Sequence, residues 1–404
     1  MTSRAPLTPR ARIAAIAAAL IGVAVLVTAL VLVARGPSAS PSPVVPSASA
    51  PVAVVSPSAP SAPSAPPPPA VTPGPPVPPI QPGPPATCGP FDPQCSRMPI
   101  SGASSPFTSQ LPCGTLGPCT LNLDVYYPRP ASATPGPTGS GPSRTAPWPV
   151  VVAVPGGPAA PGIRHGLGDF ASLLAGQGAV VFVADYREGA QYGGTFPLPY
   201  EDIGCAIRFA RANAATYGGD GSKVTLVAHS LGGFFASTEA LSSDPFTPAT
   251  GACLTPSGST KPDAFVGIAG IYSQSGITPG FLDAFFGGPA PSGSPGVPGV
   301  GASPQPAASG GTSGTSAGLA ADWAGGDPFA LARAHSNPGL VVRLIQGAND
   351  LNVRPIEAQT FEQALQAAGY NATLTMVPDA DHNSVLQNSE TIGTIMETAL
   401  SLGK

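Results

Sequence analysis

Acidic residues are absent from the chain before Asp92, and charged residues of either sign make up only 9% of the sequence. Four of the 17 basic residues precede that first acid. The remainder therefore carries 13 basic against 21 acidic residues, so it lacks the basic excess of a nucleic-acid-binding surface. We expect no nucleic-acid partner.

The N-terminal segment combines positive charge with a long apolar run. Residues 1–12 contain three arginines, and residues 13–34 are apolar apart from one glycine and one threonine. A run of about 20 apolar residues can span a bilayer, and its positive flank should stay in the cytoplasm. We therefore expect a single-pass membrane anchor at 13–34, with the bulk of the chain outside the cytoplasm. A cleaved signal peptide and secretion is the alternative.

Proline and glycine are abundant and clustered, with 55 and 50 residues. Residues 35–87 consist mainly of Pro, Ala, Ser and Val, which is typical of an extended, disordered linker. A globular domain is expected at 88–404. Within it, the Gly/Ser/Pro/Ala-rich stretch 287–319 predicts a disordered insert.

Histidine is scarce, with four residues, and the six cysteines are not spaced with histidines as in a zinc site. The sequence thus predicts no metal site. An exported domain can hold disulfides, although some cysteines could instead be free and buried. The simplest pairing is Cys88–Cys95, Cys113–Cys119 and Cys205–Cys253.

Short runs of Val, Ile and Leu alternate with helix-like segments through the expected domain. This alternation is typical of βαβ units, so we predict an α/β fold with a buried, mostly parallel sheet flanked by helices. The expected strands are 121–127, 149–154, 179–184, 223–228, 264–269, 340–345 and 372–377, and the expected helices are 170–177, 200–217, 231–242 and 355–368.

Ser230 directly follows one of these strands and precedes a helix-like segment. Small residues two positions to either side, Ala228 and Gly232, allow the sharp strand-to-helix turn that exposes a nucleophilic serine. The pattern is G-x-S-x-G with alanine in the first glycine position. A serine that merely caps the following helix is the alternative.

A nucleophilic serine needs a base and a group that orients the base. His382 follows the last expected strand and Asp350 follows the strand before it, which gives the Ser…Asp…His order of α/β-hydrolases. Asp379 and Asp381 are alternative acids, but they lie too near the histidine in sequence to reach its far nitrogen easily. His229, beside the serine, is expected to point its side chain away.

Backbone N–H groups should stabilise the oxyanion that such a serine would generate. The candidates are Leu231, at the start of the next helix, and Gly156 or Gly157, which follow the strand at 149–154. An ordinary Pro-Gly turn is the alternative reading of the glycine pair.

These motifs resemble the α/β-hydrolase carboxylesterases, near the bacterial dienelactone-hydrolase-like and hormone-sensitive-lipase-like esterases. The resemblance runs from residue 121 to the C-terminus without the insert, in LDVYYP, VVVAVPGG, VVFVADYR, FPLPYEDI, VAHSLGG, LIQGANDLNV and PDADHNSV. It implies an α/β-hydrolase fold, Ser230 as nucleophile, Asp350 as acid, His382 as base and no cofactor. Pro155 stands where the family's HGG has its histidine, so the chain departs from the family at the expected oxyanion site.

The substrate class remains open between small-molecule and lipid esters. The region 277–325 is where this fold often carries a lid, and its apolar side chains either line an acyl pocket or pack as helix core. These side chains are Phe281, Leu282, Phe285, Phe286 and Trp323. A prolyl-oligopeptidase-like peptidase and a non-catalytic binding protein displayed at the surface are alternative functions. The sequence predicts no oligomeric state.

Overall fold

The computed structural model of the chain describes residues 98–129, 146–157, 162–242, 246, 248, 251–273, 277, 280–289 and 316–403. The predicted anchor, the predicted linker and the Cys88–Cys95 pair lie outside these ranges, as does most of the predicted insert. No helix in the described ranges is both long enough and apolar enough to cross a membrane.

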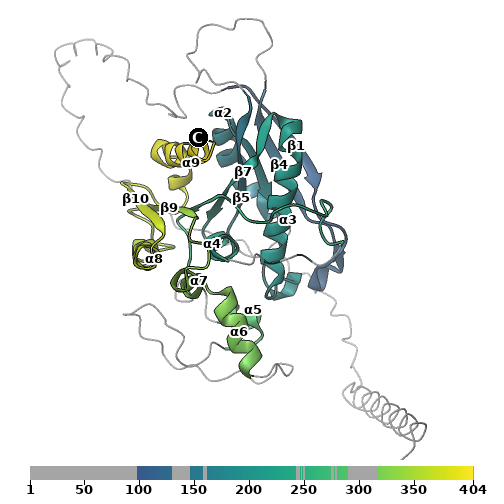
Figure 1. Cartoon of the computed structure of the whole chain (residues 1–404), viewed down its shortest axis with the longest axis vertical. Helices are drawn as coiled ribbons and strands as arrows, with labels where there is room; N and C mark the ends of the chain where they lie inside the picture. The colour runs from purple at the N-terminus through teal and green to yellow at the C-terminus, as the bar shows by residue number, and fades with distance from the viewer. Residues whose placement is uncertain are drawn as a thin grey trace, which may run out of the picture. The chain divides into compact units, whose positions relative to one another are not determined.

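In the described part of the chain, the main sheet has eight strands in the order β1-β4-β6-β5-β7-β8-β9-β10 (Figure 1). Strands β5 to β10 are mutually parallel, while β4 and β1 extend one edge in antiparallel pairing. The predicted, mostly parallel sheet is therefore confirmed. The bounds are β1 Ile100–Pro106, β4 Asn122–Pro128, β5 Trp148–Val154, β6 Val180–Ala184, β7 Gly219–His229, β8 Ala264–Ile268, β9 Val341–Gly347 and β10 Asn371–Val377.

The central strands form because their β-branched runs are buried on both faces. All five residues of β6 are buried, and so are all five of β8. By contrast, β4 is nearer the edge, and its first residues alternate between partly and fully buried. Continuous apolar runs thus mark the strands covered on both faces, as expected for a parallel sheet.

Helices cover both faces of the sheet (Figure 1). On one face lie α2 and α9, in a core cluster with Val151 and Val183. On the other lie α3, α4 and α8, in a cluster with Val150 and Val152. Successive side chains of one strand therefore pack into the cores on opposite faces of the sheet. The bounds are α2 Gly168–Gly176, α3 Leu198–Asn213, α4 Gly232–Leu241, α8 Pro355–Ala367 and α9 Ser389–Ser401.

The predicted insert extends too far at its C-terminal end. Residues 316–319 belong to α6 (Ser316–Gly326), which is followed at once by α7 (Pro328–Ala334). Trp323 of α6 is 3% exposed and packs on Phe286 with a ring-centroid distance of 4.2 Å. The buried Trp323 thus anchors α6, and the small residues 316–319 form the first part of this helix.

The apolar side chains of the predicted lid region pack as core. In α5 (Phe281–Phe286), Leu282, Phe285 and Phe286 are each at most 5% exposed. Phe285 contacts Phe235 of α4, with a ring-centroid distance of 5.4 Å. Of the two alternatives for this region, the structure therefore favours helix core over an acyl-pocket lining.

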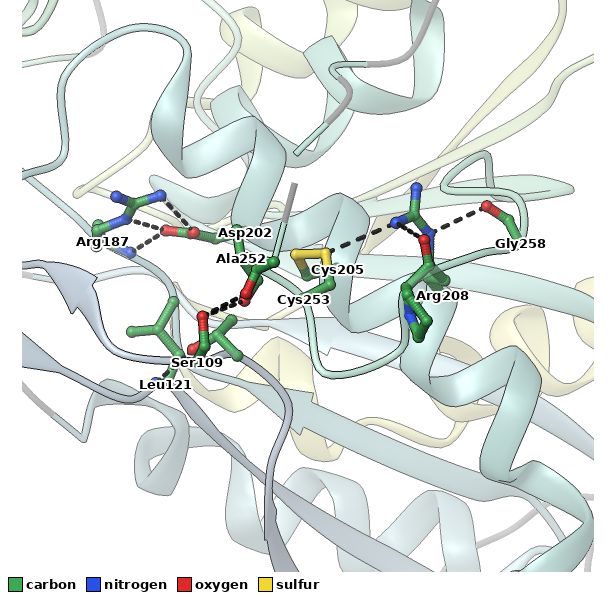
Figure 2. The surroundings of a disulfide bond; sticks show 12 residues. Ser109, Leu121, Arg187, Asp202, Cys205, Arg208, Ala252, Cys253 and Gly258 are labelled. Carbon is green, nitrogen blue, oxygen red and sulfur yellow. Dashed lines mark hydrogen bonds and ion pairs between the residues drawn. A yellow bond between two sulfur atoms is a disulfide. The ribbon is translucent and has the colours of Figure 1, made fainter. Parts of the chain in front are cut away.

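Two of the three predicted disulfides are present. Cys113–Cys119 closes the short hairpin of β2 (Leu111–Pro112) and β3 (Pro118–Cys119). Cys205–Cys253 joins α3 to the segment after α4, and Figure 2 shows Arg208 of α3 reaching the same segment at Gly258. This segment also pairs with Ser109, so the disulfide ties the N-terminal part of the domain to α3.

Candidate active site

Ser230 sits on a strained turn between β7 and α4. Its φ is +55°, in the left-handed region that side-chain-bearing residues rarely adopt. Three backbone hydrogen bonds hold it: its N–H donates to Ile268 O at 3.1 Å, and its carbonyl accepts from Gly233 N at 2.9 Å and Ile271 N at 3.0 Å. Such strain costs about 1–3 kcal/mol and persists only where the surroundings enforce it.

The small residues around the serine are needed because backbones approach closely there. A Cβ on Gly232 would lie 2.5 Å from the carbonyl oxygen of Pro155. Ala228 is fully buried between the two neighbouring strands, where it pairs with Val154 and Gly267. Alanine therefore fits the position that glycine occupies in the sequence motif.

The structure brings Ser230, His382 and Asp350 together from three separate strand ends. His382 Nε2 lies 3.0 Å from the serine Oγ, and its Nδ1 lies 2.9 Å from Asp350 Oδ2. An aspartate carboxylate only accepts, so Nδ1 carries the proton and Nε2 is free to accept one from the serine hydroxyl. This is the arrangement required for general-base activation of a serine.

Asp350 is held as an oriented anion. The residue is 1% exposed, and its Oδ1 accepts from the backbone N–H groups of Asn352 and Val353, each at 2.9 Å. Its Oδ2 accepts from Gln346 Nε2, also at 2.9 Å, beside the histidine. Burial raises the pKa of this carboxyl, but the hydrogen bonds from His382, Val353 and Gln346 outweigh burial, so the net pKa lies below its usual value.

The two alternative acids do not contact the histidine ring. The carboxylate of Asp381 accepts from the N–H groups of Asn383 and Ser384, which lowers its pKa and closes a local turn. Asp379 adopts a φ of +58° at the same bend. Asp350 is thus the carboxylate that meets His382.

The predicted oxyanion residues are neighbours in space. A Cβ on Gly156 would lie 2.5 Å from the Cβ of Ser230 and 2.7 Å from Leu231 N, so only glycine brings this backbone so close. Gly157 has a φ of +127°, which also favours glycine. The Tyr186 hydroxyl donates to Pro155 O at 3.0 Å and so holds the strand end where the family has its histidine.

Three residues around the site had no predicted role: Gln346, Tyr186 and His229. All three lie in the quoted motifs LIQGANDLNV, VVFVADYR and VAHSLGG. The motifs themselves carry no sequence signal for how these side chains support the site. The side chain of His229 was expected to point away, but it contacts His382: its Nε2 lies 2.9 Å from the backbone carbonyl oxygen of that residue. In the described ranges, no three His, Cys, Asp or Glu side chains are grouped so that they could hold a metal ion.

The parallel sheet, the flanking helices and the strained serine turn define an α/β-hydrolase fold. Residues 140–275 match the BD-FAE family, an α/β-hydrolase esterase family. The chain is therefore similar to the α/β-hydrolase esterases, as its motifs predicted. The match includes Ser230 but ends before Asp350 and His382.

Individual relatives cover the chain to different extents. Esterase LipC of Mycobacterium tuberculosis (strain ATCC 25618 / H37Rv) is 36% identical over 129 residues, which are 32% of this chain and 31% of LipC. Propionate-bound Est2, an esterase from Thermogutta terrifontis, has a TM-score of 0.49 and 20% identity, and the match covers 74% of this chain and 95% of the Est2 chain. A bifunctional GH43-CE protein from Bacteroides eggerthii has a TM-score of 0.49 and 21% identity, and the match covers 69% of this chain and 36% of that protein. The chain thus spans about a third of the curated relative.

Proposed function

We propose that the protein is a serine carboxylesterase that cleaves esters through an acyl-enzyme intermediate. The observation that carries the proposal is the continuous hydrogen-bonded path from Ser230 Oγ through His382 to Asp350. The similarity of residues 140–275 to an esterase family is independent support for the proposal, because the matched range contains neither Asp350 nor His382.

In this proposal, the Ser230 oxygen attacks the ester carbonyl carbon while its proton passes to His382 Nε2. The imidazolium then gives that proton to the departing alkoxide, which leaves the acyl group on the serine. A water molecule, deprotonated by the same nitrogen, then attacks the acyl carbon. The imidazolium returns this proton to the Ser230 oxygen as its bond to the acyl group breaks, which releases the acid. Asp350 holds the ring in the required tautomer and stabilises its charge.

The oxyanion of each tetrahedral intermediate would lie between the Leu231 N–H and the backbone N–H of Gly156 or Gly157. The close approach of Gly156 to Leu231 supports this placement. Backbone donors fixed in advance stabilise the developing charge without reorganisation.

The proposal also places the enzyme at the cell membrane, with residues 13–34 as an uncleaved anchor and the hydrolase domain outside the cytoplasm. The arginine-flanked apolar run supports this location. The two disulfides fit an oxidising compartment. Carbonate extraction and protease shaving of intact cells test it: the chain should stay in the membrane and be cut from outside. Release into the medium would favour the cleaved signal peptide.

The test of activity uses the full chain, expressed in an oxidising compartment and solubilised in mild detergent. It is assayed on p-nitrophenyl esters of graded chain length beside Ser230→Ala and a control, Ser401→Ala, which changes an exposed serine. We expect Ser230→Ala to lose roughly 10⁴-fold in kcat and the control to match the parent. A peptide p-nitroanilide with proline before the cleaved bond tests the peptidase alternative.

The outcomes separate the functions. Hydrolysis of esters but not of the anilide supports the carboxylesterase, and the chain-length profile then defines the acyl group. Faster turnover of the anilide would instead support a peptidase. Equal inertness of a folded parent and Ser230→Ala on every ester would contradict the proposal and favour a binding protein.

A further inference from the structure

His229 is the last residue of β7 and directly precedes the serine. The residue is 8% exposed, and its ring lies against that of His382, with a centroid distance of 4.7 Å and an angle of 40° between the ring planes. Its Nε2 lies 2.9 Å from the backbone carbonyl oxygen of His382. The residue therefore touches the proposed base on its backbone as well as on its ring.

The chemistry of this contact fixes the tautomer of His229. A carbonyl oxygen can only accept, so the bonded Nε2 must carry a hydrogen. Burial lowers the pKa of this histidine to about 4, although the hydrogen bond to the His382 carbonyl and the charge of Asp350 oppose the shift in part. The ring is therefore neutral at pH 7 and adds no positive charge beside the base when His382 becomes an imidazolium.

The bond to His229 complements the other contacts of the His382 loop. The ring is oriented by Asp350, and the bend before it is held by the bond from Asn349 N to Ala380 O at 2.9 Å. Neither contact ties the backbone of His382 itself to the strand that carries the nucleophile. The His229 bond does so, because it comes from the residue adjacent to Ser230.

We propose that His229 is a positioning residue that sets the distance between His382 Nε2 and Ser230 Oγ by anchoring the His382 backbone to β7. The inference rests on the proposed function and deepens it. One strand end then supplies both the nucleophile and the anchor of its base, so the two move together. Reactions of this kind lose rate steeply when a reacting group is misplaced by about 1 Å.

The test compares two amides that differ by one methylene. His229→Gln can place its Nε2 donor where the imidazole Nε2 lies, whereas His229→Asn stops short of the His382 carbonyl. We expect His229→Asn to lower kcat about 10- to 100-fold with KM within about 2-fold of the parent, and His229→Gln to recover most of kcat. Rates are expressed per site titrated with a fluorophosphonate, so that misfolded protein does not count. Equal kcat values for the two amides would overturn the proposal.

A second readout is independent of turnover. In ¹⁵N-histidine spectra at pH 7, the parent should show His229 as the Nε2–H tautomer and a downfield Nδ1–H proton of His382 bonded to Asp350. The downfield proton should persist in His229→Gln and be lost or broadened in His229→Asn. An unchanged proton in His229→Asn, or an Nδ1–H tautomer of His229, would overturn the inference. If the parent cleaves no ester, the proposed function fails, while these spectra still decide whether His229 anchors the loop.

Discussion

Glu188 should make the protein less stable as the pH rises. Replacing its ionisable carboxyl group by an amide should abolish this contribution to the pH dependence. The residue is 2% exposed, and neither carboxyl oxygen has a partner of good hydrogen-bond geometry among the described residues. Burial raises its pKa from 4.5 to about 8, and the nearby Tyr186 hydroxyl opposes that rise only in part. The folded protein therefore keeps a proton that the unfolded chain has released.

The sign and size follow from linkage between proton binding and folding. Below pH 4.5 both states are protonated, so Glu188 adds no pH dependence. Between pH 4.5 and about 8 only the unfolded state loses the proton, and the free energy of unfolding falls by about 1.4 kcal/mol per pH unit. Glu188→Gln keeps the shape and removes the ionisation. We expect the free energy of unfolding of this variant, relative to that of the parent, to rise by roughly 4 kcal/mol from pH 5 to pH 8.

The assay is denaturant unfolding of the full chain with its disulfides intact, at several pH values between 5 and 8. Glu397→Gln, which changes an exposed carboxylate of α9, is the matched control and should follow the parent at every pH. A stability difference between Glu188→Gln and the parent that stays constant with pH would refute the reasoning.

Further predictions concern the supports of the site. Replacing Cys205 and Cys253 by alanine removes a link between residues 48 apart, which should cost about 4 kcal/mol in the free energy of unfolding, read from denaturant midpoints. Gln346→Leu removes one donor to Asp350, and we expect kcat to fall about 10-fold with little change in KM, measured on the best ester. Tyr186→Phe frees the Pro155 carbonyl and should lower kcat roughly 5-fold; an unchanged kcat would mean that this bond does not hold the oxyanion loop.

The central strands and the meeting of Ser230, Asp350 and His382 were predictable, because each has a strong local signal. The continuous apolar runs of β5 to β8 are typical of strands buried between two layers. Ser230, Asp350 and His382 follow the strands β7, β9 and β10, so the parallel sheet brings these three strand ends to one edge. Asp350 was also preferred over Asp381 from its place at a strand end, and the structure agrees, because Asp381 closes its own turn.

Elements without a strong local signal were missed. β1 has the sequence ISGASSP, whose small polar residues show no apolar alternation, and it forms by pairing with β4. The opposite case is α9, where Ile392, Ile395 and Met396 recur at helical spacing, and Asn388 caps the first turn. That helix was readable from the sequence, although it was not among the predicted elements.

The supports of the site lie beyond local sequence. Gln346 reaches Asp350 across four residues of a strand end, and His229 meets His382 across a separation of 153 residues. Such contacts depend on how the strand ends converge, and no pattern of neighbours encodes them. The sequence predicted the three side chains of the candidate site, whereas the residues that hold them required the structure.

The central claim is that His382 activates Ser230 for attack on an acyl carbon. The most direct test is to treat the folded full chain with a fluorophosphonate at pH 7.5 and to map the adduct by peptide mass spectrometry, beside His382→Gln. We predict one adduct, on Ser230, that forms at least about 10³-fold more slowly in His382→Gln. No adduct on the parent, an adduct on another serine, or equal rates in the two proteins would contradict the claim.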